Sequence, residues 1–399
     1  MTTRTISFLA AAILTASAAA PAKDFASVRS HMQSLVDGAD IAGSVTVIGN
    51  KDGIVDIEAI GSQDLERGIA MTKDALFRIA SMTKPITAIG IMILVEEGKL
   101  AIDDPVEKHL PEFRGQMLVA ERGPETITLK KPSRPITLKD LLTHTSGLPG
   151  KMPEGLSELY AQRNHTLAEA VIASSQRPLD FEPGTRWAYS SAGIDVLGRI
   201  IEVTSGQSYE AFVQKRVFDP LGMVDTTFYP TDKQLARLAT LYAKDPKTRR
   251  LYAPPGATSG PPKDARFPNP AGGLFSTGPD LARFYQMMLN GGALGETRII
   301  SAASAKIMTT SYTGDLPAGF SPGIGFGLGW SVVREPQDVT EMLTPGAYGH
   351  GGGTGTQGWI DPTQNLFLIM LLQRSDMGRA DEARVRHGFP AVAVEAMKR

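Results

Sequence analysis

The sequence predicts an α/β protein in which one antiparallel sheet, flanked by helices, lies beside a second, mainly helical part. Segments typical of strands lie near both ends of the chain, within residues 43–60 and 327–373, and segments typical of helices fill most of the distance between them. Strands so distant in sequence can share one sheet, which the terminal helices then cover. Residues 366–372 are all apolar, as expected of a central strand.

The first half of the predicted sheet is a hairpin. Residues 43–49 and 53–60 are rich in β-branched side chains, and residues 50–52 between them are typical of a turn. A buried helix is predicted next, from Ser81 to a natural stop at Gly98. It has a proline in its first turn and is apolar on nearly every side.

The later elements are helices first and strands afterwards. Residues 103–135, rich in proline and charge, are expected to wrap the surface, and residues 254–262 read as a turn-rich loop. Helices are predicted at residues 138–144, 157–175, 192–203 and 280–289, and Gly206 is the expected C-cap of the third. Strands are predicted at residues 327–333, 356–360 and 366–373. A closing helix includes residues 391–397 and has Pro390 in its first turn.

This order of elements predicts two domains. Residues 23–105 form the first part of the α/β domain, residues 106–261 form the mainly helical domain, and residues 262–399 return to the α/β domain. The helical domain is thus an insertion between two groups of strands.

The N-terminus resembles a secretory signal peptide. Arg4 precedes a short apolar stretch at residues 6–14, and small residues favour cleavage after Ala18 or Ala22. An ordinary flexible terminus is the alternative. We therefore expect residues 1–22 to be removed, the protein to be secreted or periplasmic, and the mature chain to have no membrane span.

Composition excludes several classes of function. A net charge of -1 and the absence of long basic runs argue against nucleic-acid binding. The chain has no cysteine, and its six histidines show no spacing typical of a metal site. Nothing in the sequence implies a cofactor, and the oligomeric state stays open.

Ser81 and Lys84 form an S-x-x-K motif at the start of the apolar helix. Residues three apart share a helix face, so both side chains can point into one cavity. Apolar surroundings favour the neutral form of a lysine, which can then accept the proton of a serine nucleophile. The alternative is that Ser81 is simply an N-cap.

Two later motifs contain groups that would complete such a site. Tyr189 precedes an apolar helix and could exchange a proton with a nearby serine, unless it only packs at the helix start. His350 is followed by the glycines Gly351, Gly352 and Gly353, whose backbone N–H groups could approach an oxyanion. An ordinary loop or β-bulge is the alternative for this segment.

Together, S-x-x-K, Y-x-S and H-G-G resemble the serine β-lactamase and penicillin-binding-protein superfamily, in particular its class C-like branch with the family VIII carboxylesterases. The motifs occur in the family's order and at family-like separations. Stretches at residues 142–148, 182–184 and 272–277 match as well, so the resemblance covers residues 77–360. It implies a β-lactamase-like α/β sandwich with a second, mainly helical domain, and a site in the cleft between them.

The resemblance also assigns roles. Ser81 is implied to be the acyl-accepting nucleophile, Lys84 its partner in proton transfer, and Tyr189 the general base that becomes the acid. The backbone N–H groups of Ser81 and of Gly352 or Gly353 are implied to form the oxyanion hole. The sequence leaves open whether Lys84 or Tyr189 accepts the first proton, because the two can titrate as a coupled pair.

Two positions depart from the lactamase pattern. Ser191 replaces the asparagine of Y-x-N, and a short hydroxyl cannot offer the same amide contacts to a β-lactam. His350 replaces the lysine of K-T-G, and a neutral histidine holds a carboxylate less strongly than an ammonium group does. Both changes favour uncharged short-chain carboxylic esters as substrates.

Several other readings compete with a secreted serine esterase. Within the superfamily, the chain could be a weak β-lactamase or a D-amino-acid peptidase acting on cell-wall peptides. A silent binding homologue is disfavoured, since pure binding needs no Ser81, Lys84 and Tyr189. Ser321 fits G-x-S-x-G, but its Pro- and Gly-rich flanks do not suit a nucleophile elbow. His144 is expected to be structural.

Overall fold

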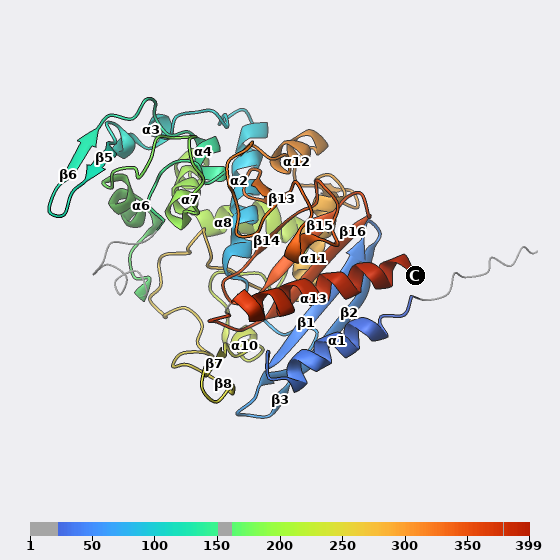
Figure 1. Cartoon of the computed structure of the whole chain (residues 1–399). Coiled ribbons are helices and arrows are strands. Elements are labelled where there is room, and N and C mark those ends of the chain that lie inside the picture. The colour runs from blue at the N-terminus through green and yellow to red at the C-terminus, as the bar shows by residue number, and fades with distance from the viewer. Residues whose placement is uncertain (1–22, 151–161, 378) are drawn as a thin grey trace, which may run out of the picture.

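The structure is a computed structural model that describes residues 23–150, 162–377 and 379–399. Its centre is an eight-stranded sheet in which every neighbouring pair is antiparallel, as predicted (Figure 1). The strand order is β12 (Ile324–Phe326), β13 (Ser331–Val333), β14 (Tyr348–Gly351), β15 (Gln357–Asp361), β16 (Leu366–Leu372), β1 (Gly43–Asn50), β2 (Gly53–Asp64) and β3 (Ile69–Ala70).

The central strands β1 and β16 join the two ends of the chain. Val47 pairs with Ile369, more than three hundred residues away, and every residue of β16 is buried. Alternate residues of β16 enter different cores: Leu368 and Met370 pack with one cluster, and Ile369 with the other. The uninterrupted apolar run therefore fits a strand that is covered on both faces.

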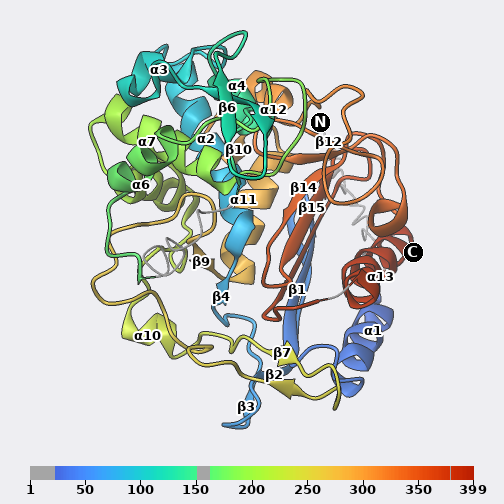
Figure 2. The same cartoon turned by 60° about the vertical axis from the view of Figure 1, so that its left-hand side comes forward.

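Helices cover both faces of the sheet. α1 (Ala26–Asp37) and α13 (Arg379–Lys398) lie side by side on one face (Figures 1 and 2). Met32 and Phe389 contribute to the core between these two helices and the sheet. α11 (Gly278–Leu289) packs on the opposite face, against β1 and β16. This arrangement gives the predicted α/β layers.

A mainly helical region lies beside the sheet, and it contains the apolar helix α2 (Lys84–Glu96), which packs against α7 (Ser191–Ser205) (Figure 2). Gly90 permits their close approach, because a Cβ there would lie 2.7 Å from Ile201 Cδ1. The other helices of this region are α3 (Val106–His109), η2 (Pro111–Phe113), α4 (Leu138–Leu142), α6 (Leu167–Ser175), α8 (Tyr209–Val213), the π-helix η3 (Gln214–Phe218), α9 (Asp219–Leu221) and α10 (Asp232–Leu235).

The remaining elements are short and connect the larger ones. One of them leads directly to the site described below: β4, which pairs with β9, precedes the 3-10 turn η1. These elements are β4 (Phe77–Arg78), β9 (Phe275–Ser276), η1 (Ala80–Thr83), β5 (Leu118–Arg122), β6 (Ile127–Lys130), β7 (Ala243–Lys244), β8 (Leu251–Tyr252), β10 (Ala293–Leu294), β11 (Thr297–Arg298), α12 (Ala302–Met308) and η4 (Asp338–Thr340).

The predicted start of the closing helix was wrong. α13 begins at Arg379, and Pro390 lies inside it instead of in its first turn. A proline within a helix has no N–H for the carbonyl four residues earlier. Here that carbonyl, of Arg386, accepts a hydrogen bond from Gln357 Nε2 at 2.8 Å. A side chain from β15 therefore compensates for the missing helical bond.

Three other expectations need correction. Of the predicted strand 327–333, only the last three residues form a strand, β13. The Pro- and Gly-rich segment before residue 327 contributes the additional strand β12. Residues 103–135 do lie largely at the surface, but they include the exposed β5–β6 hairpin, which the sequence did not indicate (Figure 1). α6 begins at Leu167, because Thr166 and Glu169 form a capping box there; residues 157–161 lie outside the described residues.

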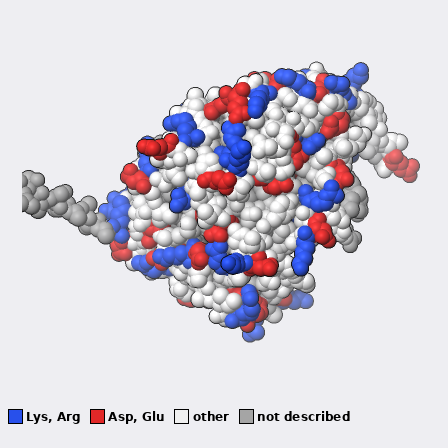
Figure 3. All heavy atoms as spheres, turned by 180° about the vertical axis from the view of Figure 1, so that it is seen from behind, with Lys and Arg blue, Asp and Glu red and all other residues white. Residues whose placement is uncertain are grey.

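The expected signal peptide, residues 1–22, also lies outside the described part of the chain. Within that part, we find no helix with the length and apolar character needed to cross a membrane. Acidic and basic side chains are interspersed over the face shown in Figure 3, which agrees with the near-zero net charge.

Candidate active site

Ser81 lies in η1, directly before α2. The residue before it, Ala80, has a left-handed φ of 45°, which is uncommon for a residue with a side chain. Two hydrogen bonds join the residues before this turn to the loop that follows β14: Thr354 Oγ1 donates to Arg78 O at 2.8 Å, and Thr356 Oγ1 donates to Ile79 O at 3.2 Å. The H-G-G motif is thereby placed next to Ser81.

Lys84 is completely buried and contacts Ser81. Its Nζ donates to Ser81 Oγ at 3.0 Å and to Ala271 O at 2.7 Å. Burial lowers the pKa of Lys84 to about 7, although the charge of Asp195 opposes this effect. A substantial fraction of Lys84 is therefore neutral near pH 7 and able to accept a proton.

Tyr189 completes this cluster. Lys84 Nζ lies 4.6 Å from the centroid of the Tyr189 ring, and the phenol makes a hydrogen bond with Ser81. Burial raises the pKa of Tyr189 well above its ordinary value, and the bond with Ser81 only partly offsets this. The phenol is therefore protonated at neutral pH and suited to donate a proton.

His144 supports Tyr189 from behind. The two ring centroids are 4.5 Å apart, His144 Nδ1 accepts from the backbone N–H of Ser190 at 3.2 Å, and His144 O accepts from Ala188 N at 2.9 Å. Burial, followed by the nearby charges of Lys84 and His350, lowers the pKa of His144 well below its ordinary value. His144 is thus a neutral residue that fixes the backbone on both sides of Tyr189.

His350 and the glycines lie across the site from Tyr189. Burial and the charge of Lys84 lower the pKa of His350 to about 3, while its Nδ1 is 2.7 Å from Gly351 O. Its imidazole is therefore neutral at physiological pH. Gly352 N–H donates to Thr356 O at 2.7 Å, whereas no hydrogen bond of Gly353 N–H is found within the described residues. Of the two candidate oxyanion donors, only Gly353 has its N–H available.

These residues open into a cavity of about 300 Å³. Its apolar wall includes Phe320 and Trp359, and the Phe320 ring packs on Tyr189 with 5.1 Å between centroids. Six of the site residues predicted from the sequence line this cavity: Ser81, Tyr189, His350, Gly351, Gly352 and Gly353. Two other predicted site residues are not on the lining: Lys84, which is buried and contacts Ser81, and Ser191, the first residue of α7.

Ser321 lies on the same cavity, but its local structure differs from that of a nucleophile elbow. An elbow places its serine between a strand and a helix. The segment after Ser321 instead forms strand β12. The structure therefore agrees with the sequence in setting Ser321 aside.

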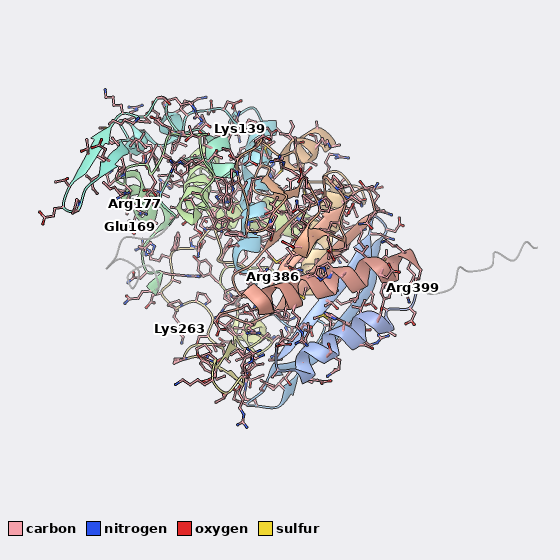
Figure 4. The ribbon with its side chains drawn as sticks, in the orientation of Figure 1. Lys139, Glu169, Arg177, Lys263, Arg386 and Arg399 are labelled. Atoms are coloured by element: carbon pink, nitrogen blue, oxygen red, sulfur yellow. The ribbon has the colours of Figure 1, made fainter. Side chains whose placement is uncertain are left out.

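Sequence reasoning missed three residues of the site. Asp195 is buried within α7 and interacts with the charge of Lys84. Arg386 lies in the N-terminal half of α13 (Figure 4) and donates to Gly352 O at 2.9 Å and to Thr356 O at 3.3 Å. Gln357 lines the cavity beside it. In the sequence, the one indication of a role for Asp195 was its place as an acidic residue among the apolar residues of α7. The sequence contained no comparable indication for Arg386 or Gln357.

A family model described as Beta-lactamase matches residues 28–391. The chain belongs to the β-lactamase family. This confirms the resemblance at the level of the superfamily, and the β-lactamase-like fold with it; the class C-like branch stays a prediction.

Proteins that are similar to this member of the β-lactamase family include esterases. The chain is 34% identical to protein Rv1367c of Mycobacterium tuberculosis, covering 92% of this chain and 94% of that protein. It is 31% identical to esterase EstB of Burkholderia gladioli, covering 87% and 91%. The solved structure of EstCE1, described as a hydrolase with promiscuous acyltransferase activity, superposes with a TM-score of 0.75 at 26% identity, covering 91% and 97%. Membership and these relatives support a serine hydrolase.

Proposed function

We propose that this β-lactamase family member is an exported carboxylesterase that works through an acyl-enzyme on Ser81. The observation that carries the proposal is the 3.0 Å contact between Ser81 Oγ and Lys84 Nζ, because burial brings the pKa of this lysine to about 7. A neutral amine at hydrogen-bond distance from a serine is suited to be its general base. Export is proposed from the signal-like residues 1–22.

In the first step, Ser81 Oγ attacks the ester carbonyl carbon while its proton passes to Lys84 Nζ. The backbone N–H groups of Ser81 and Gly353 stabilise the oxyanion that forms. The choice of Gly353 over Gly352 rests on the bond between Gly352 N–H and Thr356 O. This assignment replaces the sequence-based alternative of either glycine.

In the second step, the intermediate collapses and the alkoxide leaves with the proton of the Tyr189 phenol. The raised pKa of Tyr189 favours this donor role over that of first base. Lys84, then protonated, returns its proton to the phenolate oxygen of Tyr189, since both groups are hydrogen-bond partners of Ser81. Water attacks the acyl-enzyme in the same manner, with Lys84 again as the base, and releases the carboxylic acid and free Ser81.

Two features favour uncharged esters over β-lactams. His350, at the position of the lactamase lysine, is buried and neutral, so it offers no fixed charge to a carboxylate. The wall containing Phe320 and Trp359 suits a short apolar acyl group. The second candidate function is a weak β-lactamase or D-amino-acid peptidase, because the chain belongs to the β-lactamase family.

The test is hydrolysis of p-nitrophenyl butyrate by wild type, Ser81→Ala and Ser321→Ala. We expect Ser81→Ala to lose at least about a thousandfold in kcat and Ser321→Ala to retain catalysis. Activity that survives in Ser81→Ala and disappears in Ser321→Ala would contradict the proposal. A wild type that opens nitrocefin but cleaves no ester would favour the second candidate.

A further inference from the structure

Asp195 is a buried carboxyl group of α7 that interacts electrostatically with Lys84. Only 7% of Asp195 is exposed, and it does not line the cavity. A buried carboxyl group needs a partner, since removing it from water is costly. The proposed reaction gives this residue no role, so its position requires another explanation.

The two side chains meet at the backbone of Ala271. Asp195 Oδ1 accepts from Ala271 N–H at 3.2 Å, and Ala271 O accepts from Lys84 Nζ at 2.7 Å. One residue of the main chain thus holds the carboxyl group on one side and the amine on the other. Any displacement of Ala271 moves the acceptor that aims Lys84 at Ser81.

Close packing fixes this segment against α7. A Cβ at Gly198 would lie 2.4 Å from Pro270 Cγ, so only glycine allows the chain before Ala271 to approach the helix this closely. Pro270 O in turn accepts from Thr87 Oγ1 on α2 at 2.8 Å. α7, the 270–271 segment and α2 are therefore packed closely together, and this unit contains both Asp195 and Lys84.

The charges around Asp195 come from three other elements. Lys84 of α2 and Arg163, from the segment before α6, attract the negative charge of Asp195. That charge also raises the pKa of Tyr209 in α8. Burial nevertheless raises the pKa of Asp195 to about 7, the same range as that of Lys84. The two groups consequently titrate as a coupled pair.

We infer that Asp195 is a positioning residue that holds Lys84 toward Ser81 through Ala271 and stabilises the lysine's positive charge after it accepts the serine proton. The inference rests on the proposed function. Its logic is that of a base oriented by a third group, as in other activated serines. When Lys84 becomes protonated, the nearby carboxylate offsets the cost of a buried cation.

The test uses Asp195→Asn, which keeps an oxygen for Ala271 N–H but removes the charge, and Asp195→Ala, which removes both. Asp280→Asn is the matched control, because Asp280 is also buried and accepts from Asp225 N at 2.8 Å and Thr226 Oγ1 at 2.9 Å, but lies on α11. Thermal unfolding measures the folded fraction of every variant.

The readout is the rate at which a fluorophosphonate probe labels Ser81, measured from pH 5 to 10. In this reaction Ser81 Oγ bonds to phosphorus, fluoride leaves, and the serine proton passes to Lys84. Loss of a neighbouring opposite charge lowers a lysine pKa by about one unit or more. We therefore expect the midpoint of the acidic limb to move down by about one pH unit, and the plateau rate to fall at least about threefold, in Asp195→Asn.

We expect a larger loss in Asp195→Ala and wild-type behaviour in Asp280→Asn. A folded Asp195→Asn with the wild-type midpoint and rate would overturn the inference. The labelling assay also separates this inference from the proposed function: a wild type that is labelled at Ser81 but cleaves no ester refutes the esterase, and the variants still decide the role of Asp195. A wild type whose Ser81 is not labelled refutes both.

Discussion

Replacing Lys84 by methionine should abolish turnover and at the same time stabilise the fold at neutral pH. Methionine has nearly the same length as lysine and no charge, so it can fill the buried space of the Lys84 side chain and leave no cavity there. The proton acceptor 3.0 Å from Ser81 Oγ is lost. We expect kcat for p-nitrophenyl butyrate to fall by at least about a thousandfold.

The gain in stability follows from the lysine pKa. Burial lowers it from 10.5 to about 7, and this difference of 10.5 − 7 = 3.5 units corresponds to about 5 kcal/mol. Methionine removes this penalty but also two hydrogen bonds, worth about 1 kcal/mol each, and leaves Ala271 O unpaired at a further cost of about 1 kcal/mol. Asp195 also loses the opposite charge of Lys84, so the net increase in the unfolding free energy is at most about 2 kcal/mol.

The effect must depend on pH with a definite sign. Between pH 7 and 10.5 the unfolded chain binds a proton at Lys84 that the folded chain does not, so the wild type gains stability as the pH rises through this range. Below pH 7 both states bind that proton, and the penalty is constant. The advantage of Lys84→Met should be greatest at or below pH 7 and shrink toward pH 10.

Urea unfolding at pH 7 and pH 10 measures this difference. Ser81→Ala, which is inactive but keeps the lysine, should show the wild-type pH dependence, and Lys263→Met tests an exposed lysine (Figure 4). A Lys84→Met protein that is less stable than wild type at pH 7, or whose advantage grows toward pH 10, would refute the reasoning about burial of the charge.

Two further substitutions test the site geometry. Tyr189→Phe should lower kcat by at least about a hundredfold with little change in thermal stability, because the ring contacts remain and only the proton donor is lost; retention of the wild-type kcat would remove the phenol from the mechanism. Gly198→Ala should lower kcat by displacing Pro270 and with it Ala271, whereas Gly193→Ala on the same helix, with its nearest neighbour at 3.4 Å, should be tolerated; equal activity of the two variants would show that the 270–271 segment adapts.

Local patterns in the sequence were sufficient for most of the fold. The β-branched runs around residues 50–52 predicted the β1–β2 hairpin, and the apolar run 366–372 predicted strand β16. Gly206 does end α7 in a left-handed conformation, with a φ of 69°. Pro390 misled the prediction because a distant side chain, that of Gln357, satisfies the carbonyl that the proline leaves without a donor.

For the site, the sequence by itself determined which groups can do the chemistry, and the tertiary structure decided how they are arranged. The spacing of Ser81 and Lys84 fixes both on one side of a turn, because helical periodicity is a local property. Segments that are distant along the chain decide which glycine N–H is available, which predicted residues line the cavity and how Asp195 is linked to Lys84 through Ala271. Packing brings such segments together, and no local pattern records their partners.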